Sequence, residues 1–263
     1  MGLIELDTAR CTGDGGCVAE CPLNLFVMGE DHHPHEVPGA AELCIVCGHC
    51  IAVCPDGALS LAGIKADDLA PIRQENRVST EQADQFLKTR RSVRVYQETP
   101  IPHKELENCL GVARWAPSAA NRQPVRWTVI ETPEKLAQLA DQVVEGLRTI
   151  PYFRRLVKDY EKGIDRVFRG APHVVVAHAP KQGLDPVVDC TIALTYFELA
   201  AHARGLAACW SGLLMAAAKT NPAVAGFIEL PEDHIIGGAM MVGYPRHHYH
   251  RIPTRHDLWV DYQ

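Results

Sequence analysis

The apolar and polar positions divide the chain into two regions with different patterns. Up to about residue 70 the apolar residues come in short runs, of which A-L-S-L-A-G-I after Pro55 predicts a short strand. A stretch without an apolar period follows and is typical of a linker. From Ser79 onward helical and strand periods alternate, which predicts an α/β or α+β layer structure. We therefore expect domains over residues 1–70 and 85–263, joined by a linker over residues 71–84.

The second region contains four predicted helices and four predicted strands. The helices are expected over residues 79–88, 102–115, 133–147 and 186–204, and the strands over residues 125–130, 173–178, 207–211 and 235–243. The helix over residues 186–204 is apolar on almost every side. A helix of this kind must be covered on every side, so we expect it to supply core and to form a homodimer interface.

Charge is divided unevenly between the two regions. Residues 1–70 contain two Lys or Arg and eleven Asp or Glu, a net charge of −9, whereas the remainder contains 24 and 21, a net charge of +3. An acidic first region favours docking to a basic surface on an external electron donor or acceptor protein, although it could serve solubility alone. Neither region has the basic face that nucleic-acid binding requires.

The N-terminal residues M-G-L-I-E-L-D-T-A-R show neither a signal peptide nor a myristoylation pattern, and no run is long and apolar enough for a membrane span. We therefore expect a soluble cytoplasmic protein without a membrane partner. The loop over residues 23–43 carries three histidines, which we interpret as a solvated connection, with metal binding as the alternative. Cys109, Cys190 and Cys209 lie in apolar contexts and are expected to be buried and inert.

The remaining seven cysteines form two similar runs. The first, C-I-V-C-G-H-C-I-A-V-C-P from Cys44 to Pro55, has three thiols at three-residue steps and a fourth before proline, which is typical of a [4Fe–4S] site in a two-cluster protein. The second runs from Cys11 to Pro22 in the same frame, with Asp14 at the place of one cysteine. A zinc site would leave two cysteines of each run unexplained, and a disulfide framework is expected in secreted chains.

Residues 1–65 therefore resemble the two-cluster bacterial ferredoxins. The resemblance implies that Cys21, Cys44, Cys47 and Cys50 hold one [4Fe–4S] cluster, and that Cys11, Cys17 and Cys54 hold the other with Asp14 at its fourth corner. Three outcomes stay open for Asp14. It ligates a [4Fe–4S] cluster, water takes its place, or that iron is lost and a [3Fe–4S] cluster remains.

Three stretches of the second region carry flavin-type features. Arg90-Arg91-Ser92-Val93-Arg94 follows a helix and offers guanidinium groups and a hydroxyl to a phosphate, although such clusters are often plain surface. The run A-P-S-A-A-N-R-Q-P over residues 116–124 combines small residues with two amides that suit the edge of an isoalloxazine ring. The third stretch comprises G-L-A-A-C-W-S-G over residues 205–212, G-Y-P over residues 243–245 and R-I-P-T-R over residues 251–255.

These stretches resemble the FMN-dependent nitroreductase family over residues 85–263, which implies an α+β fold. The resemblance implies that FMN is held by Arg90, Arg91, Ser92, Arg94, Pro117, Ser118, Ala119, Asn121, Gln123, Trp210, Ser211, Gly212, Arg251 and Arg255. It also implies a homodimer with flavin sites between subunits. Trp210 is equally well interpreted as core. The segment over residues 148–170 is either a substrate lid or a solvated helical excursion.

The combination predicts an oxidoreductase that passes electrons from the ferredoxin-type region through FMN to a small organic acceptor, such as a nitroaromatic, an activated alkene or a quinone. No catalytic side chain stands out, because the flavin supplies that chemistry. One alternative is the reverse direction, in which a dehydrogenase reduces a ferredoxin pool. The other is an electron-transfer module that has no small-molecule substrate of its own.

Overall fold

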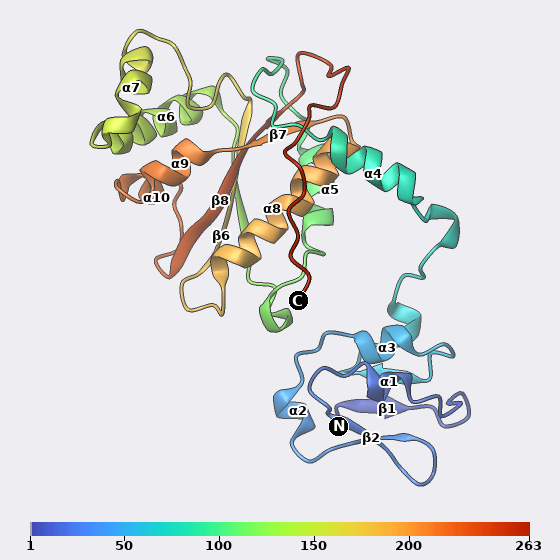
Figure 1. Ribbon diagram of the computed structural model, residues 1–263. Helices are drawn as coiled ribbons and strands as arrows, with labels where there is room; N and C mark the ends of the chain where they lie inside the picture. Colours follow the sequence, from blue (N-terminus) through green and yellow to red (C-terminus); the bar gives the residue numbers. More distant parts are fainter. Residues whose placement is uncertain (1) are drawn as a thin grey trace. The chain divides into compact units, whose positions relative to one another are not determined.

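The computed structural model describes residues 2–263, in which short helices and strands up to Arg77 are followed by a larger layered region (Figure 1). Contacts between residues divide the chain into two units, one up to Arg77 with residues 120–122 and the other over residues 78–119 and 123–263. Both units mix helices and strands, and the predicted α+β class is confirmed. Within the described residues no helix has the length and apolarity needed to span a membrane.

The first unit is built from short elements. Its strands form two antiparallel pairs, β1 with β4 and β2 with β3. The elements are β1 (Ile4–Leu6), α1 (Gly16–Ala19), β2 (Phe26–Met28), β3 (Pro34–Glu36), α2 (Ala40–Leu43), α3 (His49–Val53), β4 (Leu59–Leu61), η1 (Ala66–Asp68) and η2 (Gln74–Asn76). The predicted strand after Pro55 is therefore confirmed as β4.

Each of the helices α1, α2 and α3 begins directly after a glycine with left-handed backbone. Gly15, Gly39 and Gly48 have φ values of 74°, 80° and 76°, a conformation that residues with a side chain rarely adopt. The turns at Gly15 and Gly48 lead into α1 and α3, whose first residues lie within the two cysteine runs. Gly15 and Gly48 therefore determine where the chain turns within the two cysteine runs.

The second unit contains a four-stranded antiparallel sheet in the order β5-β6-β8-β7. Its strands are β5 (Arg126–Ile130), β6 (His173–Pro180), β7 (Ala207–Trp210) and β8 (His234–Gly243). Strand β6 lies between β5 and β8, and all but its last residue are buried. Antiparallel sheets often expose one face, so burial along the whole strand requires cover on both faces.

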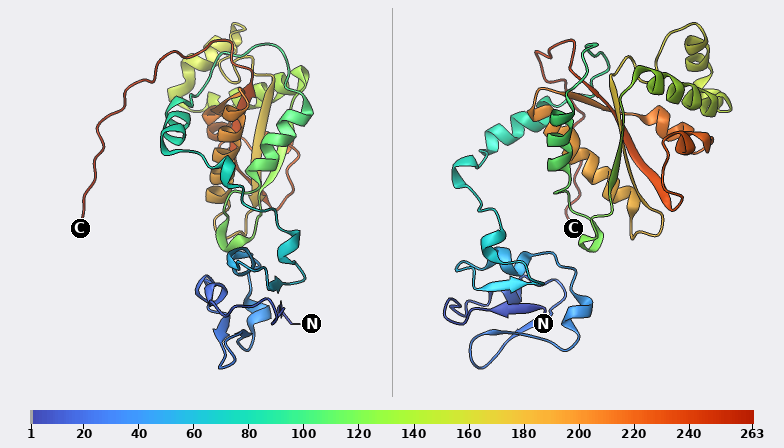
Figure 2. Two further views of the ribbon diagram at one scale, coloured as in Figure 1. Left: turned by 90° about the vertical axis from the view of Figure 1, so that its right-hand side faces the viewer. Right: turned by 180° about the vertical axis from the view of Figure 1, so that it is seen from behind.

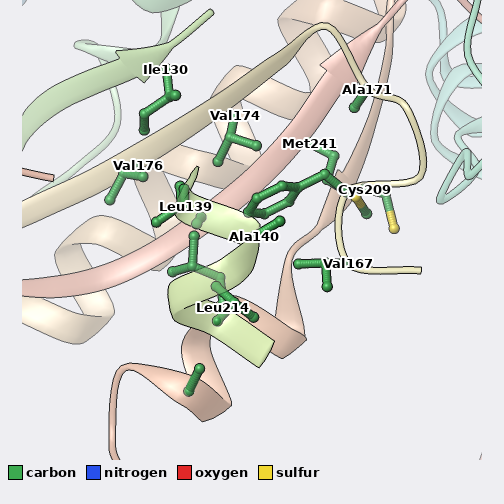
Figure 3. Packing of buried hydrophobic residues seen from close by; sticks show 14 of the residues in the cluster. Ile130, Leu139, Ala140, Val167, Ala171, Val174, Val176, Cys209, Leu214 and Met241 are labelled. Atoms are coloured by element: carbon green, nitrogen blue, oxygen red, sulfur yellow. The ribbon is translucent and has the colours of Figure 1, made fainter. Parts of the chain in front are cut away.

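Helices supply this cover in two layers. Helices α5 (His103–Ala113) and α8 (Pro186–Ala203) pack on one face, where Val175 and Ala177 of β6 point. Helices α6 (Pro133–Arg148), α7 (Arg154–Glu161), α9 (Gly212–Ala217) and α10 (Ala223–Phe227) pack on the other face, as Figures 1 and 2 show. Figure 3 shows Val174 and Val176 directed toward Leu139 of α6 in this second core. The remaining elements are α4 (Thr80–Thr89), η3 (Ala119–Asn121) and η4 (Pro151–Phe153).

All four helices and all four strands predicted for the second unit are present, and their ends differ from the predicted ones by at most two residues. Helix α4 begins where the sequence indicates, because the Ser79 hydroxyl accepts from the Gln82 N–H and the Gln82 side chain accepts from the Ser79 N–H. Cys109, Cys190 and Cys209 are buried, as predicted. The expected loop over residues 23–43 differs, because it contains the β2–β3 hairpin and α2.

Helix α8 buries one side and exposes the other within a single chain. Leu194 and Phe197 have no exposed surface, whereas Val187, Val188 and Tyr196 are 47%, 47% and 38% exposed. The Thr191 and Thr195 hydroxyls on the exposed side donate to carbonyls one turn earlier in the same helix. This leaves the outer surface of α8 largely apolar.

Candidate functional site

Two cavities in the first unit are each lined by four of the predicted cluster ligands. Cys21, Cys44, Cys47 and Cys50 line one cavity, together with apolar side chains that include Leu25, Phe26 and Leu61. The other cavity is lined by Cys11, Asp14, Cys17 and Cys54. Each set therefore combines residues from both cysteine runs, because Cys21 of the second run joins the first and Cys54 of the first run joins the second. Such interleaving is the pattern of a two-cluster site.

Backbone N–H groups already point at three of the sulfurs. Leu25 donates to Cys21 Sγ at 3.3 Å, and Ala58 donates to Cys54 Sγ at the same distance. Val46 donates to Cys44 Sγ at 3.4 Å. These donors lower the cost of a thiolate, and hydrogen bonds to sulfur are one of the levers that set a cluster's potential.

Asp14 lies at the rim of the second cavity. One carboxylate oxygen accepts a hydrogen bond from the Gly16 N–H at 3.1 Å, which fixes the turn before α1. The carboxylate has two oxygens and several lone pairs, so this bond leaves acceptor capacity for a metal. Deeper in the unit, burial raises the pKa of the Cys50 thiol to about 11, so metal binding there must displace a proton.

The segment that follows α4 gathers cationic and hydroxyl groups in the second unit. The Arg90 guanidinium pairs with Glu198 of α8 at 2.8 Å and lies 3.5 Å from the Ser92 hydroxyl oxygen. Arg94 donates to the Ser92 carbonyl at 3.2 Å. Arg91 Nε is buried and has no hydrogen-bond partner over residues 2–263. Three guanidinium groups and one hydroxyl over five residues suit an anionic group such as a phosphate monoester.

Contacts with the sheet hold this segment in place. The Val93 N–H donates to the Ala208 carbonyl of β7 at 3.2 Å, and the Val93 side chain is buried. The Tyr96 hydroxyl donates to the Val93 carbonyl at 2.6 Å, and Tyr96 pairs with Pro245 in an isolated bridge. The cationic segment therefore lies beside β7 and the end of β8.

The P-S-x-x-N-x-Q-P loop between α5 and β5 has an unusual backbone. Ala120, Asn121 and Gln123 all have left-handed φ values, between 48° and 52°. The loop is held by Ser118, whose hydroxyl accepts from the Gln123 N–H at 2.8 Å. Three left-handed residues without glycine store strain, and such strain is typical of functional loops.

Asp189 of α8 provides a second anchor for this loop and was not identified from the sequence. Its side chain is 3% exposed, and its carboxylate accepts from the Ala119 N–H at 2.9 Å. Asp189 also lines a cavity of about 120 Å³ with Pro117, Ser118 and Gln123 of the loop. The sequence carries one signal for it, an acidic residue within the largely apolar first half of the helix, but its partner lies 70 residues away.

The β7–α9 junction contributes one half-exposed aromatic residue and one buried hydroxyl. Trp210 is 39% exposed and packs closely over Gly238 of β8, where a Cβ would lie 2.5 Å from the indole ring. Ser211 is 2% exposed, and its hydroxyl has no hydrogen-bond partner in the part of the chain that the structure describes. The next residue, Gly212, begins α9. A buried hydroxyl without a partner is costly in a finished core, so this position is suited to a bound polar group.

The two C-terminal arginines are not brought to these groups within one chain. Arg251 and Arg255 lie in an exposed segment without helix or strand that follows β8. Figure 2 shows this C-terminal segment as an extended stretch of backbone that runs away from the sheet. The cationic segment, the β7–α9 junction and the loop residues other than 120–122 instead belong to the second unit. The residues of the second unit fit a planar cofactor that carries a phosphate, because Arg91 Nε and the Ser211 hydroxyl are buried without a partner among the described residues.

Comparison with known proteins gives a family for each unit. The nitroreductase family matches residues 87–244, and the 4Fe-4S dicluster domain matches residues 10–59. Both resemblances indicated by the sequence motifs are therefore confirmed.

Individual relatives agree with this result. A protein of Archaeoglobus fulgidus, provisionally named as an NADH dehydrogenase/NAD(P)H nitroreductase, is 26% identical over 170 residues, which cover 63% of this chain and 87% of the relative. An iodotyrosine deiodinase of Nematostella vectensis is 24% identical over 200 residues, which cover 68% and 72%. The crystal structure of a nitroreductase with bound FMN from Bacteroides fragilis has a TM-score of 0.62 at 22% identity and covers 70% of this chain and 100% of its own. The chain thus belongs to the nitroreductase family and carries, ahead of that domain, a 4Fe–4S dicluster domain of ferredoxin type.

Proposed function

We propose that this protein is an iron–sulfur flavoprotein in which electrons pass from the ferredoxin-type unit to FMN and then to an organic acceptor. The observation that carries this proposal is the presence of both domains in one chain. An acceptor such as a nitroaromatic, an activated alkene or a quinone takes up two electrons and two protons, whereas an iron–sulfur cluster delivers one electron at a time. When bound, FMN supplies the conversion between one-electron and two-electron transfer.

The proposed cluster ligands are the two sets that line the cavities of the first unit. Cys21, Cys44, Cys47 and Cys50 would hold a [4Fe–4S] cluster. The second set, Cys11, Asp14, Cys17 and Cys54, would hold a [4Fe–4S] or [3Fe–4S] cluster. This assignment is supported by the shared lining of each cavity and by the N–H groups that face Cys21, Cys44 and Cys54.

The proposed FMN site uses the cationic segment for the phosphate and the P-S-x-x-N-x-Q-P loop for the ring. Ser92 and Arg94 would donate to phosphate oxygens, and the Asn121 and Gln123 amides would meet the polar edge of the ring. Ser211 would donate its free hydroxyl proton to the cofactor. The similar Bacteroides fragilis structure contains FMN, and this supports the assignment. Arg251 and Arg255 are proposed to reach the phosphate only with a rearranged or partner C-terminal segment.

We also propose a homodimer, in which the exposed side of α8 is covered by a second copy. Val187, Val188 and Tyr196 form an apolar surface that a monomer would leave in water. Covering it in a two-fold interface buries the same residues on both copies. Light scattering of the flavin-loaded protein should give about twice the 28.9 kDa chain mass. The chain mass itself, with flavin retained, would reject the dimer.

The main experiment is a turnover assay under anaerobic conditions. The purified protein should contain roughly seven to eight irons per FMN, as two clusters imply. With a chemical reductant it should reduce some acceptors much faster than others, and the rate should saturate with acceptor concentration. Equal, unsaturated rates with every acceptor would indicate an electron carrier, and about four irons per FMN would contradict the two-cluster assignment.

The name of the Archaeoglobus fulgidus relative supports one further arm of this assay. If NADH or NADPH reduces the flavin and the clusters follow, the protein can run in the opposite direction and deliver electrons to an external ferredoxin. Reduction of added ferredoxin by NADH would establish this direction. If neither NADH nor NADPH reduces the clusters, electrons should instead enter the protein through the ferredoxin-type unit.

A further inference from the structure

A second cavity of the nitroreductase-type unit lies on the α6 side of the sheet and has a volume of about 460 Å³. It is open to solvent and is lined by the first half of α6, the end of α7, residues 165–172 and the segment near Pro100. Its walls are mainly apolar and include Leu136, Ala140 and Phe168. No described residue lines both this cavity and the one beside the P-S-x-x-N-x-Q-P loop. It is therefore separate from the proposed flavin site.

All charged side chains that line this cavity are acidic, namely Glu98, Glu131 and Asp165. The Asp165 carboxylate accepts from three backbone N–H groups of residues 167, 168 and 170, so it shapes the wall. Glu131 pairs with the exposed His103 at 2.8 Å. Glu98 is exposed, and it forms no ion pair with any other residue that the structure describes. The carboxylates of Glu98 and Glu131 can therefore contact a ligand whose apolar part packs against Leu136, Ala140 and Phe168.

The buried imidazole next to this cavity, that of His173, stays neutral. His173 follows the lining Pro172, and its Nε2 accepts from the Ile101 N–H at 2.8 Å. Its proton must then lie on Nδ1, which is buried and has no hydrogen-bond partner among the residues described. Burial lowers the pKa of His173, because the charged imidazolium would lose its hydration. His173 therefore does not oppose a cation in the cavity.

We propose that this cavity binds a small organic cation, an apolar ring or chain that carries an ammonium group. Its volume lies in the range of small-molecule sites, roughly 300–1,000 Å³. The apolar floor would bury the hydrocarbon part, and Glu98 and Glu131 would face the ammonium group. An organic anion would meet two carboxylates and no cationic lining residue, so the site should discriminate by charge.

The test compares three indole ligands of matched shape, tryptamine, tryptophol and indole-3-acetate, by calorimetry on the holoprotein under anaerobic conditions. Tryptamine should bind at one site per chain, at least about tenfold more tightly than indole-3-acetate, with tryptophol between them. The flavin absorption spectrum should not change. Equal affinity for the three ligands, or a flavin spectrum that titrates with tryptamine, would overturn the proposal.

Variants on the cavity wall complete the test. Ala137 is an exposed residue of α6 that lines the cavity, so Ala137→Trp should fill it and weaken tryptamine binding at least tenfold. Gln138→Trp, one residue further on the same helix and outside the lining, is the matched control. Glu98→Gln and Glu131→Gln should each weaken binding about two- to fivefold, as expected for partly exposed charge pairs. If Ala137→Trp and Gln138→Trp bind tryptamine equally, the ligand does not occupy this cavity.

Discussion

Replacing Asp189 by alanine should weaken FMN binding more than it weakens the fold. Asp189 is 3% exposed, and its carboxylate holds the Ala119 N–H at 2.9 Å. A hydrogen bond to a charged group contributes about 1.5–3 kcal/mol, and Ala119 is only partly buried, so the lower end applies. If the free energy that holds the loop in its binding conformation falls by about 1.5 kcal/mol, the FMN dissociation constant should rise roughly tenfold. The loss to the fold is partly offset, because a buried charge is removed.

The assay is reconstitution of flavin-free protein with FMN, followed by the change in flavin fluorescence. Asp189→Asn keeps the shape of the side chain and a neutral acceptor for the Ala119 N–H. A neutral hydrogen bond contributes about 1 kcal/mol less than a charged one, so this variant should bind FMN about fivefold more weakly than the natural protein. The order of affinity should be Asp, then Asn, then Ala.

Asp185 supplies the matched control on the same helix. Its carboxylate accepts from the Val188 N–H at 3.2 Å and caps α8, and Asp185 is not among the described residues that line the cavity beside the loop. Asp185→Ala should lower the unfolding free energy by about 1 kcal/mol and leave the FMN dissociation constant within about twofold. If Asp189→Ala and Asp185→Ala bind FMN equally well, the proposed role of Asp189 is wrong.

Three further predictions concern other parts of the molecule. Asp14→Cys should change the EPR signal and potential of one cluster, whereas identical spectra of the natural protein and Asp14→Ala would show that Asp14 is no ligand. Gly238→Ala should lower the unfolding free energy by about 1–3 kcal/mol in thermal denaturation, because its Cβ would lie 2.4 Å from Leu194 Cδ1. Gly226→Ala is the control and should not lower the unfolding free energy, because no described atom lies within 4 Å of the added Cβ. Burial lowers the pKa of His178 below its ordinary value of 6.5, so the unfolded state takes up the proton first and stability should fall as the pH drops below about 6.5. This fall should be shallower in His178→Gln, and equal slopes would contradict the assignment.

The elements of the second unit could be predicted because their signals are local. The Ser79 and Gln82 capping pair marks the start of α4, and Thr132 before Pro133 marks the start of α6. Strand β6 was recognisable as buried because H-V-V-V-A-H has no polar alternation. In each case the information lies within a few residues of the element it defines.

The features that could not be predicted depend on short elements or on distant partners. Strands β2 and β3 have three residues each, too few for a period of two to stand out beside the histidines of the intervening turn. The role of Asp189 depends on a contact with Ala119, far away in the sequence. The cavity near Phe168 requires α6 and the segment after α7 to meet, and the charge of that segment indicates only a lid or a solvated excursion.

The first unit has very little that could keep it folded without its metal. Its longest helix has five residues and its strands have three, and Cys17 and Cys50 are themselves part of its small apolar core. Helices this short are not stable alone, so the clusters must act as the centre of the fold. We therefore expect cluster loss to unfold this unit and expose it to proteases. The cellular level of the protein would then follow the supply of iron and sulfide, and fall under oxidative damage, without any dedicated regulator.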